Sequence, residues 1–328
     1  MRGYRAILAV AFCLCLTQAQ SSAQEASMDA ARRAYERGEY ANAIELLKVA
    51  AGKEPGNGEI QLLLTKSYLE SNQYDNAVNS GEKAVAIDPK NSVYHQWLGE
   101  AYGEKADHAS MLSAYALARK TQREFAIAVE LDERNFDAAQ DLIDYDCSAP
   151  SMVGGGEDKA QPLIQKLMGL DSAEGHFGAG ACKAAKKDFS GADLEYAKAL
   201  ELKPKTANRV YDIGDYFLQR GQGEKLLDVA AAGESLAPKD PRGKYYRAGG
   251  WILKGEKYPD AEKLLREYLA AGPMRSTYPS PSDAHYWLGR LYAAQKNVTG
   301  AKSEYQEALK LNPKHKKAHE ALKQLGGQ

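Results

Sequence analysis

Two short clusters of residues in this sequence have the types and spacing that could support ligand chemistry. The first is Gly154-Gly155-Gly156-Glu157-Asp158-Lys159, which joins three glycines to a lysine. Backbone amides cradle a phosphate when a G-x-x-x-x-G-K-[ST] sequence follows a strand. The cluster lacks that spacing and no strand pattern precedes it, so we expect no nucleotide or other cofactor there.

The second cluster is His315 and His319, which stand four residues apart. On a helix this spacing places both imidazoles on one face, as a metal pair requires. Lys314, Lys316 and Lys317 surround the pair and would repel a cation, so no metal site is expected. The sequence also contains no nucleophile elbow, no HExxH motif and no paired-carboxylate pattern. It therefore predicts no catalytic residue and a protein that is not an enzyme.

The net charge and the length of the chain narrow the classes of function and fold that remain possible. The formal net charge is −1, and no segment is basic enough to track phosphates, so nucleic acid is not an expected partner. A chain of 328 residues is too long for one typical compact core. Several domains or an elongated repeat array are therefore expected.

The first 23 residues have the three-part layout of a secretory signal peptide. Two arginines precede the apolar run 6–16, and small and polar residues follow at 17–24. A membrane anchor would need about 20 apolar residues, and no later segment is apolar enough to span a bilayer. We expect cleavage after Ala23, or as second choice after Ala19, and export of residues 24–328 to the periplasm or out of the cell.

One sequence phrase occurs twice, far apart in the chain. The segments His95–Tyr102 and His285–Tyr292 share the pattern W-L-G-x-x-Y. After the second copy, small residues at Ala301 and Ala308 alternate with bulky ones, and Pro313 ends the pattern. This spacing predicts two antiparallel helices whose small residues permit close approach.

These positions closely resemble the tetratricopeptide repeat, a helix–turn–helix unit of about 34 residues. The resemblance implies an all-α, right-handed α-solenoid of about eight such repeats. A closing helix at 316–325 would cover the apolar face of the last repeat. The third repeat carries extra residues within 105–121, and longer connections are expected at 146–156 and 273–281. The repeats are expected at 24–57, 58–91, 92–135, 136–172, 173–206, 207–240, 241–281 and 282–315.

Two cysteines, Cys147 and Cys182, remain after removal of the signal peptide. The repeat register places both on the first helices of neighbouring repeats, and export would expose them to an oxidising compartment. A disulfide requires Cα atoms within about 7 Å, whereas packed helices lie about 8–10 Å apart. The sequence therefore leaves open a disulfide or two free thiols.

The family resemblance also suggests where a partner would bind. First helices of such repeats line a concave groove, and one groove position falls three residues before the small Gly or Ala. In the last four repeats that position holds an aromatic residue, which suits a peptide groove. The alternative is that these rings pack between helices. The four residues are Phe177, Tyr211, Tyr245 and Tyr286.

The sequence thus favours a non-enzymatic interaction or scaffold module of the cell envelope. It would bind a partner peptide or protein along its concave groove. The alternative is an accessory subunit or small-ligand carrier for an exported enzyme or transport system. The sequence does not identify the partner.

Overall fold

The computed structural model describes residues 27–272, 275 and 277–326, and over these ranges the regular elements are helices with no strand. The predicted signal peptide, residues 1–23, lies outside the described residues. Contacts divide the chain into two compact units. The first unit runs through Tyr145 and includes Ala149–Gly155, and the second comprises Asp146–Ser148 and the chain from Gly156 onward.

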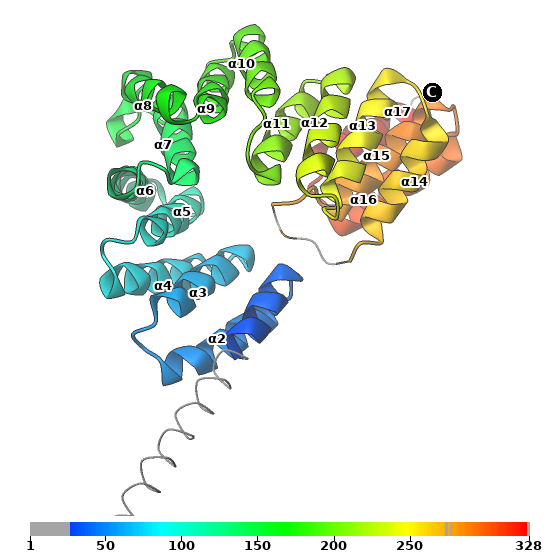
Figure 1. The fold of residues 1–328 in the computed structure, drawn as a ribbon. Coiled ribbons are helices and arrows are strands. Elements are labelled where there is room, and N and C mark those ends of the chain that lie inside the picture. Colours follow the sequence, from blue (N-terminus) through cyan, green and yellow to red (C-terminus); the bar gives the residue numbers. More distant parts are fainter. Residues whose placement is uncertain (1–26, 273–274, 276, 327–328) are drawn as a thin grey trace, which may run out of the picture. The chain divides into compact units, whose positions relative to one another are not determined.

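The first unit is a succession of antiparallel helix pairs, coloured blue to green in Figure 1. Residues 27–36 are helical and pair with the helix that follows. The short 3-10 helix η1 packs on α6. The elements are α2 (Tyr40–Lys53), α3 (Gly58–Glu70), α4 (Tyr74–Ile87), α5 (Ser92–Asp107), α6 (Met111–Leu131), most of α7 (Phe136–Ser148) and η1 (Ser151–Val153).

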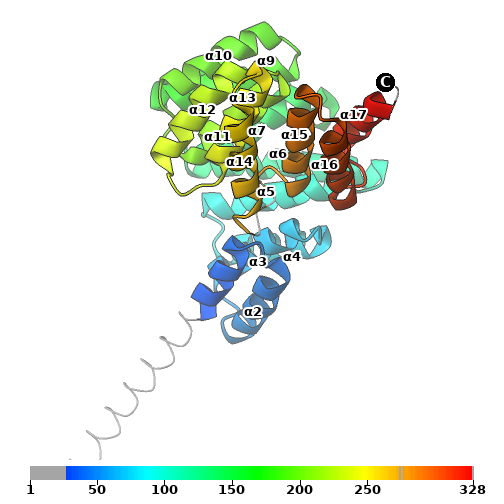
Figure 2. The same cartoon turned by 90° about the vertical axis from the view of Figure 1, so that its right-hand side faces the viewer.

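The second unit continues the same pattern, and Figure 2 shows its last three helices side by side. The closing helix α17 packs on α16, at the place where the sequence predicts a cap. The helices of the second unit are α8 (Glu157–Leu170), α9 (Ser172–Ala185), α10 (Phe189–Glu201), α11 (Ala207–Gln219), α12 (Gly223–Leu236), α13 (Arg242–Lys254), α14 (Tyr258–Leu269), α15 (Pro281–Ala294), α16 (Val298–Leu311) and α17 (Lys316–Gly326). The predicted fold class, an all-α solenoid of helical repeats, is confirmed.

Paired helices approach closely because a first-helix glycine faces a bulky side chain of the second helix. A Cβ atom at Gly289 would lie 2.4 Å from the ring of Tyr305, and one at Gly99 would lie 2.6 Å from the ring of Phe125. Such distances leave no room for alanine. Each ring therefore occupies a space that the Cβ atom of any other residue would fill. We call such a space between paired helices a slot.

A polar contact accompanies each of these slots. The first helix of the pair carries a histidine four residues before its glycine. This histidine contacts a glutamate of the second helix, and that glutamate directly precedes the aromatic residue in the sequence. Three pairs have this geometry, with Nδ1 to Oε2 distances of 2.6 Å for His95–Glu124, 2.7 Å for His176–Glu195 and 2.7 Å for His285–Glu304. Lys244 and Glu267 make the equivalent contact at 2.7 Å. The histidines at this position hold the helix pairs together.

The glycine run at 154–156 has a structural role. A Cβ atom at Gly155 would lie 2.0 Å from the carbonyl oxygen of Ala149, and Gly154 has a φ of 109°. The hydroxyl of Tyr145 lies 2.9 Å from the carbonyl oxygen of Val153 and 2.7 Å from that of Ala118. The run forms a tight turn against α6.

Three of the four residues predicted to line a groove lie in the core of the second unit. The exposed fractions are 6% for Phe177, 1% for Tyr211 and 2% for Tyr245. Tyr286 is partly buried against Trp287, Tyr305 and His315. The prediction of an open aromatic stripe is therefore wrong. The alternative raised by the sequence, packing between helices, describes Phe177, Tyr211 and Tyr245.

Tyr211 shows the physical reason. Its ring fills a slot opposite Gly233, where a Cβ atom would lie 2.4 Å from the ring. The guanidinium of Arg242 covers Tyr211 at 4.5 Å from the ring centroid, and the same guanidinium lies 4.2 Å from the ring centroid of Tyr278. Tyr268 also donates a hydrogen bond of 2.6 Å to the carbonyl oxygen of Pro279. Arg242, itself in contact with Tyr278, thus covers the ring of Tyr211 and keeps it from solvent.

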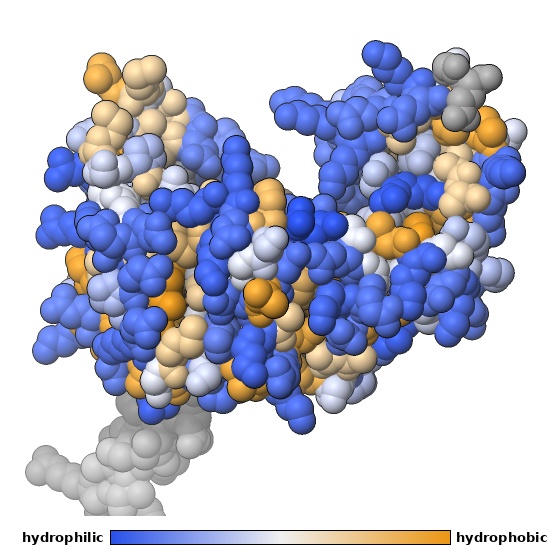
Figure 3. Space-filling model, turned by 90° about the horizontal axis from the view of Figure 1, so that it is seen from above, coloured by the Kyte–Doolittle hydropathy of each residue, from blue (hydrophilic) through white to orange (hydrophobic). Residues whose placement is uncertain are grey.

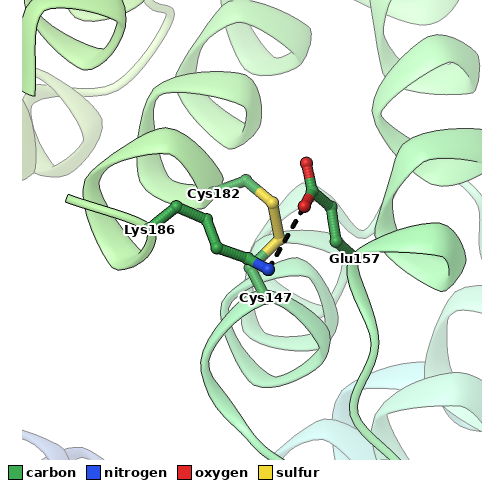
Figure 4. Close-up of a disulfide and its surroundings, with 4 residues drawn as sticks. All are labelled: Cys147, Glu157, Cys182 and Lys186. Atoms are coloured by element: carbon green, nitrogen blue, oxygen red, sulfur yellow. Dashed lines mark ion pairs between the residues drawn. A yellow bond between two sulfur atoms is a disulfide. The ribbon is translucent and has the colours of Figure 1, made fainter. Parts of the chain in front are cut away.

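A disulfide joins Cys147, in the last turn of α7, to Cys182 in α9, with their Cα atoms 5.1 Å apart. Both residues belong to the second unit and both are buried. Figure 4 shows the ion pair of Lys186 and Glu157, 3.2 Å long, beside the bridge. The bond therefore ties the start of the second unit to α9.

The burial of the tyrosines makes a stability prediction. Tyr211→Ala and Tyr245→Ala should each lower the free energy of unfolding by about 3–5 kcal/mol, because each empties a core slot. Tyr211→Phe should change it little, since the Tyr211 hydroxyl is buried without a hydrogen-bond partner among the described residues. Tyr115→Ala is the exposed control, at 41% exposure. Urea unfolding measures all four, and a loss below about 1 kcal/mol for Tyr211→Ala would contradict core packing.

The disulfide makes a second prediction. Peptide mapping after alkylation without reductant should recover the Cys147 peptide linked to the Cys182 peptide. The double variant Cys147→Ser/Cys182→Ser should lose about 2–4 kcal/mol of unfolding free energy, because the bridge restricts the unfolded chain. Alkylation of both cysteines in the unreduced native protein would contradict the bond.

Candidate partner-binding groove

Two carboxyl groups of the first unit, Glu100 and Asp141, have raised pKa values. Burial and then the charge of Glu104 raise the pKa of Glu100 on α5 to about 7. Burial and then Glu100 raise the pKa of Asp141 on α7 well above its ordinary value, while Gln96 donates a hydrogen bond of 2.9 Å to Asp141. Two interacting carboxyl groups with raised pKa can share one proton between them, and Gln96 holds Asp141 in place through its amide N–H.

Histidines could form a metal site, and long apolar helices could span a membrane. Within the ranges that the structure describes, no group of three or more His, Cys, Asp and Glu side chains is placed to hold a metal ion. His315 contacts Asp283 at 3.1 Å, and His319 contacts the carbonyl oxygen of Pro313 at 2.9 Å. None of the described helices combines the length and apolarity needed to cross a bilayer.

At one joint within the second unit, the backbones of α10 and α11 lie further apart than those of most successive helices. Side chains bridge these two helices, because Tyr216 donates a hydrogen bond of 2.6 Å to Asp193 and the rings of Tyr196 and Tyr216 lie 4.5 Å apart. The backbones of α10 and α12 stay apart as well. The connection after α10 contains Lys203, with a φ of 60°, followed by Pro204. The side of α10 that faces α12 is therefore left partly open.

The gap forms an open groove of about 810 Å³ between α10 and α12. Leu194 is 73% exposed and Leu236 is 46% exposed, so large apolar side chains face solvent here. Its lining is completed by Ala197, Lys198, Leu200, Glu201, Lys203, Pro204, Val210, Lys225, Asp228, Ala231, Ala232 and Ser235.

The two walls of the groove are helix faces. The lining residues of α10 include Leu194, Ala197 and Glu201, and those of α12 include Lys225 and Ala232. Residues spaced three, four and seven apart share one face of a helix. At 1.5 Å per residue these walls are about 10 and 16 Å long. This length matches two to three turns of a third helix.

Charged side chains lie at the rim of the apolar floor. Lys198 pairs with Glu201 at 3.1 Å and Lys225 pairs with Asp228 at 3.9 Å, and Lys203 adds a further positive charge. An apolar centre with a charged rim is the usual anatomy of a protein interface. Figure 3 shows, for comparison, a face where polar side chains predominate and hydrophobic residues occur in small groups.

Sequence reasoning missed this groove, although a signal was present. Leu194 stands two residues before the slot aromatic Tyr196. The same position holds Arg123, Arg266 and Ser303 in other repeats. A leucine at a position that is otherwise polar marks the exposed wall of α10.

Comparison with known proteins gives the family. Two models described as tetratricopeptide repeat match the sequence, one at residues 34–100 and the other at residues 253–316. No curated protein matches the chain.

Similar solved structures include a tetratricopeptide-repeat protein of Thermus thermophilus, 20% identical, with a TM-score of 0.48 over 60% of this chain and 99% of that one. A repeat protein of Parabacteroides merdae is 14% identical, with a TM-score of 0.45 over 93% and 99% of the two chains. The Cut9–Hcn1 assembly of APC/C gives 14% identity and a TM-score of 0.49 over 90% of this chain and 54% of that one.

The two family models match segments that the structure shows to be antiparallel helix pairs. The glycine and aromatic positions of those pairs carry the packing between their helices. The chain is therefore a protein that contains tetratricopeptide repeats, at residues 34–100 and 253–316.

Proposed function

We propose that this protein is a non-enzymatic interaction scaffold that binds an amphipathic helix of another protein in the groove between α10 and α12. Tetratricopeptide repeats are in general non-enzymatic modules that bind proteins. The observation that carries the proposal is the apolar wall of α10 in this groove, where Leu194 is 73% exposed. A partner helix would cover this wall.

The chemistry of the groove favours a helix with an apolar stripe. Burying a leucine side chain contributes about 1.5–3 kcal/mol, so Leu194 and Leu236 can act as anchors. Apolar residues spaced three and four apart on the partner would face the matching rows of α10 and α12. Carboxylates at the edge of that stripe would meet Lys198, Lys203 and Lys225.

A small apolar ligand is the second candidate. The volume of about 810 Å³ lies within the range of small-molecule pockets, about 300–1,000 Å³. The groove is open along its length between two parallel rows of side chains, which suits a helix better than an enclosed ligand. The carrier role is therefore the alternative.

We further propose that the protein works in the cell envelope after export. The basic, apolar and small-residue order of residues 1–23 supports export. The disulfide of Cys147 and Cys182 supports an oxidising compartment, because disulfides persist there.

The groove is tested by a photo-crosslinking residue at position 194, with position 49 as the control. Val49 is also exposed, at 58%, but lies on α2. Irradiation in the native host should join position 194 to one protein segment whose apolar residues recur three and four apart. Position 49 should not capture that segment.

Matched variants complete the experiment. Leu194→Asp should reduce co-purification of the crosslinked partner at least about tenfold, because an interface anchor is worth about 2 kcal/mol or more. Val49→Asp should leave it unchanged, and circular dichroism should show both variants folded. Equal retention of the partner by Leu194→Asp and Val49→Asp would reject the groove.

A further inference from the structure

The hairpin of α5 and α6 is longer than the other repeats. Helix α6 has 21 residues, whereas the second helices α4, α10 and α12 have 14, 13 and 14. Helix α5 is also lengthened, to 16 residues. The extra turns form the end of the hairpin, from about Lys105 to Leu117, beyond the length that a standard repeat needs.

This end carries apolar side chains in solvent. Met111 and Leu112 are each 88% exposed, and Tyr115, one turn further along α6, is 41% exposed. No other described large hydrophobic residue is as exposed as Met111 and Leu112. Packing inside the repeat does not account for them, because so little of either side chain is covered.

Basic residues follow the apolar end on the same helix. Arg119, Lys120 and Arg123 are exposed, and the sequence from His108 to Arg123 contains no Asp or Glu. Leu112, Arg119 and Arg123 share one face of α6, because their spacing is close to whole helical turns. At 1.5 Å per residue, Arg119 lies about 10 Å along the axis from Leu112.

The acidic residues around this end lie on α5 and further along α6. On α6 the first is Glu124, which contacts His95 of α5 at 2.6 Å. Glu104 and Asp107 lie close enough to Tyr74, on α4, to raise its pKa together with burial. Lys105 on the same helix pairs with Asp75 of α4 at 2.7 Å. Glu104 and Asp107 therefore lie near Tyr74 of α4, whereas α6 carries only basic charges from Met111 to Arg123.

We propose that the end of the α5–α6 hairpin inserts into the surface of an anionic lipid bilayer. The order along α6 is an apolar tip, a tyrosine and then basic residues. A bilayer surface has the matching order of layers from inside to outside, which are acyl chains, the region where aromatic residues gather and the phosphate headgroups. An interfacial helix buries its apolar residues about 5–10 Å deep, which fits the spacing from Leu112 to Arg119.

The shape of the tip favours lipid over a protein partner. Met111 and Leu112 project from a helix end and line no groove. A deformable acyl layer can surround such a convex tip, whereas a protein partner would need a matching pocket. Attraction of each basic residue to anionic lipid adds to insertion, so the binding requires both features.

Vesicle sedimentation of the full protein purified from its host tests the proposal. Vesicles of phosphatidylethanolamine with phosphatidylglycerol should bind it, and vesicles of phosphatidylcholine alone should bind it at least about tenfold less tightly. Met111→Ser/Leu112→Ser should weaken binding to the anionic vesicles by more than about tenfold, through loss of apolar burial. Arg119→Glu/Arg123→Glu should weaken it comparably, with a strong dependence on salt.

The matched control is Val49→Ser/Leu311→Ser, which removes two other exposed apolar side chains, 58% and 50% exposed, and should bind as the wild type does. Circular dichroism verifies that each variant is folded. No binding to anionic vesicles would overturn the proposal, as would equal binding by Met111→Ser/Leu112→Ser and the control. Loss of a co-purifying protein by Met111→Ser/Leu112→Ser, without vesicle binding by the wild type, would assign the tip to a protein partner instead.

Discussion

The close approach of paired helices is the constraint on which the rest of this structure depends. A ring from one helix enters the space left by a glycine on the other, as Tyr305 does at Gly289 and Tyr211 does at Gly233. Dense packing of this kind leaves little tolerance for added volume. Each slot also fixes the register of the pair, so the histidine–glutamate contacts fall at equivalent places.

The same constraint decides which residues are free to bind a partner. Rings packed between helices are buried, and this removes Phe177, Tyr211 and Tyr245 from the surface. Surfaces suited to binding occur where the regular packing is interrupted. One is the groove between α10 and α12, and another is the extended hairpin of α5 and α6, which carries Met111 and Leu112 at its end.

The fold could be predicted from the sequence because its signals are local. Glycine, alanine, aromatic residues and proline recur at fixed offsets, and these offsets specify helix ends and facing surfaces. The candidate site could not be predicted in the same way. Their repeat positions place Tyr211 and Tyr245 on the first helix of a repeat. Whether Tyr211 is exposed depends on Gly233, Arg242 and Tyr278, which belong to other segments of the chain. The groove beside Leu194 left one local signal, a leucine at an offset that is polar in other repeats, but its two walls belong to different repeats whose separation no offset specifies.

Alanine substitution at two glycines of the second unit measures the central constraint most directly. Gly289→Ala should lower the free energy of unfolding by about 1–3 kcal/mol, because its Cβ atom must displace the Tyr305 ring. Gly169→Ala on α8 has no atom within 4 Å of the new Cβ, so helix propensity should raise the free energy of unfolding by up to about 1 kcal/mol. We predict that, in urea unfolding, Gly289→Ala lowers the free energy of unfolding and Gly169→Ala raises it. Stabilisation by both substitutions would contradict the slot as the basis of helix pairing.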